Sequence, residues 1–154
     1  MMSVQAMIKQ IRVMYYAVFG GMVAFTLGSL FIILSRGAFA DLSPIQATNL
    51  QSVVLLLVFA GIPGAHYYHR KKCKNLPEEM DLQSKLAIYK TGFVIKQMVF
   101  EGLCLLGLMV YILTASHIYI IVASVCIVTQ LINYPSITRI SEDLGVEAHE
   151  FDEK

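Results

Sequence analysis

Glu101 is the residue whose type and position most clearly suggest chemistry. It is an acid inside a long apolar run and follows Lys96 by about a turn and a half of helix. An ionisable group inside a membrane is costly unless it is protonated, paired or hydrated, so it normally faces the interior of a helix bundle. This position makes Glu101 a candidate functional residue.

Polar residues around Glu101 extend the candidate site. Gln97 shares a helix face with Glu101, because residues three and four apart stack on one side of a helix. Lys96 lies about 140° round the helix from Glu101, so we expect it to extend toward the aqueous boundary rather than pair with the acid. Gln130 and Asn133 of the last apolar run, with Tyr15 or Tyr16 of the first, are possible partners. The candidate intramembrane polar site is therefore Glu101, Gln97, Lys96, Gln130 and Asn133.

A metal site is a weaker possibility at the end of the second apolar run. His66, His69 and Cys73 fall at i, i+3 and i+7, and imidazole with thiolate can bind zinc or copper. A fourth ligand is not evident, and the four basic residues at 70–74 repel a cation. The favoured interpretation is an interfacial His-Tyr-Tyr-His cluster with no metal, and we expect no cofactor.

Motifs of soluble enzymes are absent from the sequence. It has no G-x-S-x-G, no phosphate-cradling loop and no paired acids at catalytic spacing, so we expect no enzymatic activity. The formal net charge is +1. Because nucleic-acid binding depends on basic surfaces, and the basic residues here lie beside apolar runs, we expect no nucleic-acid partner.

Long apolar segments must position these residues. The chain has 154 residues, of which 56% are hydrophobic and 15% charged, and its mean hydropathy is +0.63. Four apolar runs, at about 13–35, 51–69, 97–114 and 117–134, each approach the ~20 residues that cross a bilayer. Backbone polar groups in lipid need internal partners, so the runs must be helical. The sequence predicts an all-α fold, a four-transmembrane-helix bundle in one domain over 1–146.

The segments between and after these runs set the remaining architecture. Only Ala115 and Ser116 separate the last two runs, which predicts a tight antiparallel hairpin. The third helix is predicted to begin near Pro77, since proline and acids favour a first helical turn. Apolar residues at helical spacing predict a short interfacial helix over about 136–146. The acidic residues 147–154 form a C-terminal tail.

Charge asymmetry predicts the orientation. Excess Lys and Arg in short loops marks the cytoplasmic side. In a four-span arrangement Arg36 lies alone on one side. The opposite side holds Lys9, Arg12, Arg70, Lys71, Lys72, Lys74, Lys85, Lys90 and Arg139. We therefore expect two in-out-in hairpins with both termini cytoplasmic. The first run, roughly 23 residues long, exceeds the ~7–15 of a signal peptide, so we expect it to be retained.

The order of several short motifs resembles a family of small, uncharacterised four-span integral membrane proteins of Bacteroidetes-type bacteria. The motifs are Tyr89-Lys90, Lys96, Glu101-Gly102, Pro135-Ser136, and Ile140 with Asp143-Leu144. The likeness covers most of the chain, although Tyr134 stands where that family usually has arginine. The resemblance implies location and architecture only, in the bacterial inner membrane.

Two functions are consistent with these features. The favoured one is a small multi-pass membrane protein of structural or accessory type, whose partners are the lipid bilayer and a second copy or a larger membrane complex. The alternative is a small proton- or cation-coupled transporter or channel that uses Glu101. It would resemble the dimeric four-span multidrug exporters in size, but those carry their glutamate in the first span and use membrane tryptophan, which this chain lacks.

Overall fold

Helices are the only regular secondary structure in the part of the chain that the computed structural model describes, residues 3–74, 76–77 and 79–151. The all-α prediction is confirmed. The elements are α1 (Val4–Arg36), α2 (Pro44–Lys74), α3 (Leu82–Thr114), α4 (Ile118–Ile132), α5 (Ile137–Leu144) and the 3-10 helix η1 (Ala148–Phe151).

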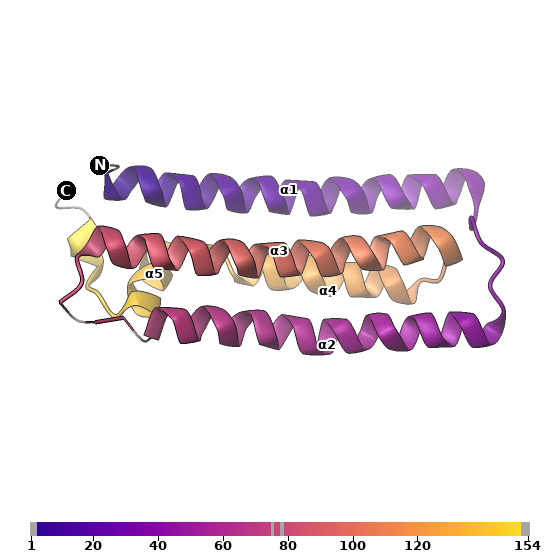
Figure 1. Cartoon of the computed structure of the whole chain (residues 1–154). Coiled ribbons are helices and arrows are strands. Elements are labelled where there is room, and N and C mark those ends of the chain that lie inside the picture. The colour runs from indigo at the N-terminus through magenta and orange to yellow at the C-terminus, as the bar shows by residue number, and fades with distance from the viewer. Residues whose placement is uncertain (1–2, 75, 78, 152–154) are drawn as a thin grey trace.

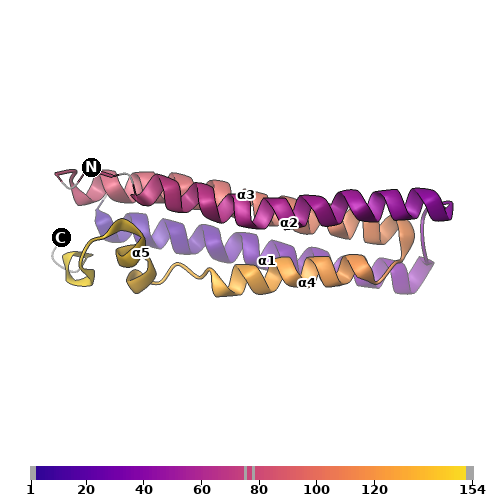
Figure 2. The ribbon, with the colours of Figure 1, turned by 90° about the horizontal axis from the view of Figure 1, so that it is seen from below.

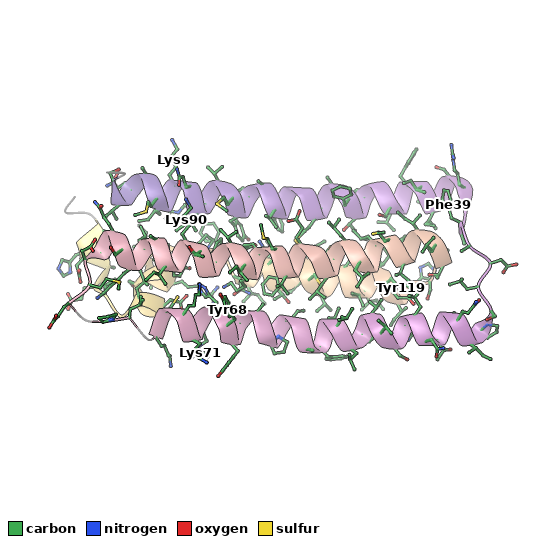
Figure 3. The ribbon with its side chains drawn as sticks, viewed as in Figure 1. Lys9, Phe39, Tyr68, Lys71, Lys90 and Tyr119 are labelled. Carbon is green, nitrogen blue, oxygen red and sulfur yellow. The ribbon has the colours of Figure 1, made fainter. Side chains whose placement is uncertain are left out.

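The first four helices lie lengthwise beside one another (Figures 1 and 2). Helix α3 is central and packs against α1, α2 and α4. The two chain termini, the α2–α3 connection and α5 lie at one end, and the α1–α2 and α3–α4 connections lie at the other. We call the first of these the terminal end. The basic side chains Lys9, Lys71 and Lys90 lie in its half of the bundle, whereas Phe39 and Tyr119 lie toward the opposite end (Figure 3).

The start of α3 differs from the sequence-based expectation. The helix begins at Leu82 rather than near Pro77, and the side chain of Asp81 accepts a hydrogen bond from the backbone N–H of Ser84 at 3.0 Å. Before it, the N–H of Met80 donates to the carbonyl of Pro77, which closes a turn. An Asp at the N-cap satisfies an otherwise unpaired helical N–H, and this capping outweighs the preference of Pro77 for a first turn. Glu78, one of the acids behind the expectation, is outside the described residues.

Helix α4 is shorter than the apolar run that predicts it. Its 15 residues rise about 22 Å, less than the ~30 Å hydrocarbon core of a bilayer. Pro135 lacks a backbone N–H and cannot continue the helix, and the chain turns by 83° into α5. By length and composition, α1, α2 and α3 can cross a membrane, and α4 with α5 makes a fourth such segment if the bent pair counts as one.

The bundle has two buried apolar clusters and an apolar outer surface. One cluster, around Cys104, Leu108 and Val122, fills the middle and the end opposite the terminal end. The other, around Ile11, Tyr89 and Ile140, fills the terminal end. The outer faces of α1 and α2 expose large apolar side chains, for example Leu34 at 85% and Phe59 at 76%. Since soluble proteins rarely expose such continuous apolar surface, this exterior is suited to lipid.

Candidate functional site

Polar side chains from α1, α2, α3, α5 and the end of α4 meet inside the terminal half of the bundle. Seven polar or charged side chains are buried in the part of the chain that the structure describes, and five of them belong to this region: His69, Lys96, Gln97, Gln130 and Asn133. Buried polar groups in proteins are almost always hydrogen-bonded. Their contacts form three groups.

The deepest group joins three helices. Gln130 Nε2 on α4 donates to Gln97 Oε1 on α3, and both side chains are almost fully buried. The hydroxyl of Tyr15 on α1 donates to the backbone carbonyl of Gln130 at 3.2 Å. Gln97 Nε2 and Gln130 Oε1 have no hydrogen-bond partner among the described residues. The pair is therefore a hydrogen-bonded contact between α3 and α4 in an otherwise apolar interior, and within the described residues the NH2 group of Gln97 and the amide oxygen of Gln130 have no partner.

The second group is centred on Asn133, the C-cap of α4. Lys96 Nζ on α3 donates to Asn133 Oδ1 at 3.4 Å. The amide nitrogen of Asn133 donates to the carbonyl of Thr129 at 2.6 Å and lies 3.4 Å from His66 Nε2. Lys96 is only 3% exposed, so the expectation that its side chain extends to the aqueous boundary is wrong. The cause is that α2, α4 and α5 surround this part of α3, and Asn133 offers an acceptor inside.

The third group links α2 to α5. His69 Nε2 lies 3.4 Å from Asp143 Oδ2 and 4.0 Å from Cys73 Sγ. Burial acts to raise the pKa of Asp143, but the hydrogen bond from His69 and the nearby positive charges of Lys96 and Arg139 outweigh it and lower that pKa below its usual value. Asp143 is therefore a carboxylate held in place by neighbouring positive and hydrogen-bonding groups.

The three candidate metal ligands, His66, His69 and Cys73, belong to two different groups of contacts. His69 and Cys73 are neighbours, whereas His66 contacts Asn133 of the second group instead. Within the described residues, no group of three His, Cys, Asp or Glu side chains is arranged to hold a metal ion. The sequence spacing placed the three on one face of α2, but the contacts from α4 and α5 separate their roles.

Glu101 lies apart from the other four candidate residues. It is half-buried, and its Oε1 lies 4.0 Å from the position that a Cβ on Gly21 of α1 would occupy. Its carboxyl therefore faces the α1–α3 interface, whereas Gln97 and Lys96 face α4. The five predicted residues form two side-chain pairs, Gln97 with Gln130 and Lys96 with Asn133, and one separate acid.

A cavity of about 360 Å³ opens beside the second and third groups. Besides His66, His69 and Asn133, its lining has four basic side chains, Arg70, Lys74, Lys96 and Arg139, and two acidic ones, Glu142 and Asp143. Sequence reasoning missed the contributions of Arg139, Glu142 and Asp143. The signal available was the charged face of the predicted helix at 136–146, but its contact with α2 and α3 depends on the bend after Pro135.

In the part of the chain that the structure describes, these features define a helical protein in which α1, α2 and α3 are suited to cross a membrane, as is the bent pair α4–α5 if it counts as one segment. A polar cluster lies at one end of the bundle. No protein-family model matches the chain, and neither curated proteins nor solved structures gave a match.

Proposed function

We propose that the protein is a four-span membrane protein of the bacterial inner membrane with both termini in the cytoplasm. In this arrangement α1 with α2, and α3 with α4, form two in-out-in hairpins, and α5 is the short helix at the membrane interface. The proposal is supported by the apolar exterior of the long helices and by the basic side chains in the terminal half (Figure 3). Positive residues are retained on the cytoplasmic side, so the terminal end would face the cytoplasm.

Labelling of single introduced cysteines tests this topology. Phe39, in the α1–α2 connection, is 56% exposed, and Gln5 is exposed at the terminal end. The native cysteines Cys73, Cys104 and Cys126 are all buried. In intact spheroplasts, a membrane-impermeant maleimide should label Phe39→Cys, and it should label Gln5→Cys only after lysis. The reverse pattern, or equal labelling of both variants before lysis, would contradict the proposed orientation.

For the activity, we propose a structural or accessory role, with the lipid bilayer and a second copy or a larger complex as partners. The observation that carries it is the pairing of the candidate residues with one another: Gln97 bonds to Gln130 and Lys96 bonds to Asn133. Side chains used in this way hold α3 to α4. Interhelical hydrogen bonds of this kind contribute about 0.6–2 kcal/mol in membrane proteins, which suits a packing role.

The alternative function, a proton- or cation-coupled transporter, is favoured by one feature. Glu101 is a half-buried acid on the apolar helix α3, it faces α1 across Gly21, and it stands outside the bonded pairs. Ionisable residues at such positions often mark proton or ion pathways. The two functions therefore make different demands on the same carboxyl group.

Two substitutions at Glu101 separate the functions. In the accessory role, Glu101→Gln should leave both the unfolding temperature and the pH gradient of proteoliposomes unchanged, and Glu101→Leu should loosen the α1–α3 contact. In the transporter role, a cation added to wild-type proteoliposomes should drive proton movement that Glu101→Gln abolishes without loss of folding. Glu79→Gln, at an exposed acid before α3, is the control for removing a carboxyl group outside the apolar helix. Proton movement that depends on Glu101 would overturn the accessory proposal.

A further inference from the structure

We infer that the cavity at the terminal end binds an anionic phosphate group, presented either by a lipid headgroup or as free phosphate. The cavity holds about 360 Å³, at the lower end of the ~300–1,000 Å³ typical of ligand sites. Its walls come from α2, α3, α5 and the C-cap of α4. The inference deepens the proposed accessory role, and it rests on the proposed membrane topology for the lipid source only.

The charge of the lining favours an anion. Four basic side chains against two acidic ones leave two positive charges in excess, with histidines neutral. One of the acids, Asp143, already contacts His69 at 3.4 Å. A concave site with low-dielectric walls concentrates the field of such charges, so the excess acts more strongly on an ion inside the cavity than on one at an open surface.

Lys96 places a buried positive charge in the lining of the cavity. The side chain is 3% exposed, and its recorded polar contact is the neutral amide oxygen of Asn133 at 3.4 Å. An ammonium group has three donors, and burying a charge is costly unless the charge is paired. The ring of Phe93, 5.4 Å from Nζ, offers only a weak further attraction. The carboxylate of Asp143 attracts this ammonium, but it also faces His69 and Arg139, so an anion in the cavity would add counter-charge where basic groups are in excess.

Arginines and a lysine provide the contacts nearer the mouth. Arg70 and Lys74 are exposed and lie four residues apart on the last turns of α2, so their side chains share a face. A guanidinium N–H of Arg139 on α5 donates a hydrogen bond to the carbonyl of Ile132, and its other N–H groups have no further hydrogen bond among the described residues, so they could reach a ligand. Arginine binds phosphate through two parallel hydrogen bonds, which makes the set suited to phosphate rather than to a simple halide.

The location of the cavity makes it accessible to two sources of phosphate. In the proposed topology it opens at the cytoplasmic boundary of the bilayer, where basic pockets between helices bind anionic headgroups. A soluble phosphate would reach the same side chains from the cytoplasm. Both ligands present the same chemistry to Arg70, Lys74 and Lys96, and the experiment has to distinguish them.

Thermal unfolding of the full chain in an uncharged detergent, followed by circular dichroism, tests the inference. A ligand that binds only the folded state raises the unfolding temperature with its concentration, and the rise gives an apparent Kd. The added probes are short-chain phosphatidylglycerol, short-chain phosphatidylcholine and inorganic phosphate, with chloride at matched ionic strength. The variants are Arg70→Gln and Lys74→Gln, and the matched control is Lys71→Gln, an exposed lysine on the same turns of α2 that does not line the cavity.

We expect phosphatidylglycerol to raise the unfolding temperature more than phosphatidylcholine, and Arg70→Gln or Lys74→Gln to weaken the apparent Kd roughly tenfold while Lys71→Gln leaves it unchanged. The same pattern with inorganic phosphate identifies a free phosphate as the ligand. No rise with either anionic probe, or equal loss of the response in Lys71→Gln, would overturn the inference. These measurements in detergent do not depend on sidedness, so an incorrect topology and an empty cavity give different results.

Discussion

His69 Nε2 on α2 lies 3.4 Å from Asp143 Oδ2 on α5, and this contact fastens the short C-terminal helix to a long apolar one. His69 is almost fully buried, and the side chain of Asp143 is 27% exposed. The sequence separates the two residues widely, and only the 83° bend between α4 and α5 brings them together. The pair determines where α5, and with it one wall of the cavity, is held.

Acid should release α5 through this contact. The pKa of Asp143 is lowered in the folded protein, because the hydrogen bond from His69 and the charges of Lys96 and Arg139 outweigh the effect of burial. A carboxylate with a depressed folded pKa contributes stability above its unfolded pKa, which is about 3.9, and that stability is lost as the pH falls through the folded value. Asp143→Asn should therefore lower the free energy of unfolding at pH 7 by about 1–3 kcal/mol.

The pH profile of unfolding in micelles, measured by circular dichroism, checks this prediction. Wild type should lose stability relative to Asp143→Asn below about pH 4. Glu142→Gln, at the exposed acid next in sequence, is the matched control and should behave as wild type. If Asp143→Asn and wild type differ by the same amount at every pH, the carboxylate does not provide the stabilisation.

The helical class and the long apolar segments follow from the sequence, because backbone groups in lipid leave no other option. The predicted start of the third helix and the predicted end of the fourth differ from the structure for physical reasons. The preference of proline for a first turn predicts a start of α3 near Pro77, but the capping oxygen of Asp81 determines the start at Leu82. The fourth run was expected over 117–134, yet its helix ends at Ile132, just before Asn133 and Pro135.

The candidate site is only partly readable from the sequence. Gln97 and Gln130 are polar residues in apolar runs, and such residues face neighbouring helices, so both could be selected without a structure. Which residues pair depends on helix rotation and tilt, which side-chain packing sets. Lys96 shows the difference: sequence reasoning extends it toward water, while the packing of α5 over α3 buries it. Asp143 could not be selected, because the bend that brings it to His69 is a tertiary feature.

Lys96→Met should separate binding from folding. The substitution removes a costly buried charge but also the hydrogen bond to Asn133 Oδ1, so the two effects oppose each other and we expect only a small change in the unfolding temperature without ligand. The rise in unfolding temperature that anionic phosphate causes should become smaller, because the lining of the cavity loses the positive charge of Lys96. Circular dichroism with and without phosphatidylglycerol measures both effects.

Lys90→Met is the control for Lys96→Met. Lys90 is also on α3, but its Nζ donates to Gln10 Oε1 at 2.6 Å and it does not line the cavity. Its substitution should leave the phosphate response unchanged. Strong destabilisation by Lys96→Met with an intact phosphate response would show that the lysine serves the α3–α4 contact rather than a ligand.

The Gln97–Gln130 bond should be visible as an energetic coupling. Gln97→Leu or Gln130→Leu alone leaves a buried amide without its partner, and each should lower the free energy of unfolding by about 1–3 kcal/mol. The double substitution removes both polar groups and should cost less than the sum of the two. A double-mutant cycle in micelles gives the coupling, and Gln5→Leu, at an exposed position of α1, shows the effect of replacing a glutamine that is not buried between helices. Additive single and double effects would mean that the pair is not bonded in solution.

Gly92→Ala should disturb the His69–Asp143 contact from behind. A Cβ at Gly92 of α3 would lie 3.0 Å from His69 Nδ1 and 3.9 Å from Lys72 Cβ, so the buried imidazole has to move. Because the imidazole also contacts Asp143 and packs edge-on against Tyr89, the shift affects the attachment of α5, and we expect a loss of about 1–3 kcal/mol in unfolding free energy. Gly102→Ala is the matched control on the same helix: nothing lies within 4 Å of its added Cβ, and alanine favours a helix over glycine by up to about 1 kcal/mol. We expect Gly92→Ala to lower the free energy of unfolding and Gly102→Ala to raise it. Proteolysis of the chain beyond α5 should become faster in Gly92→Ala alone. Equal stabilisation by both substitutions would mean that His69 has room to move without releasing Asp143.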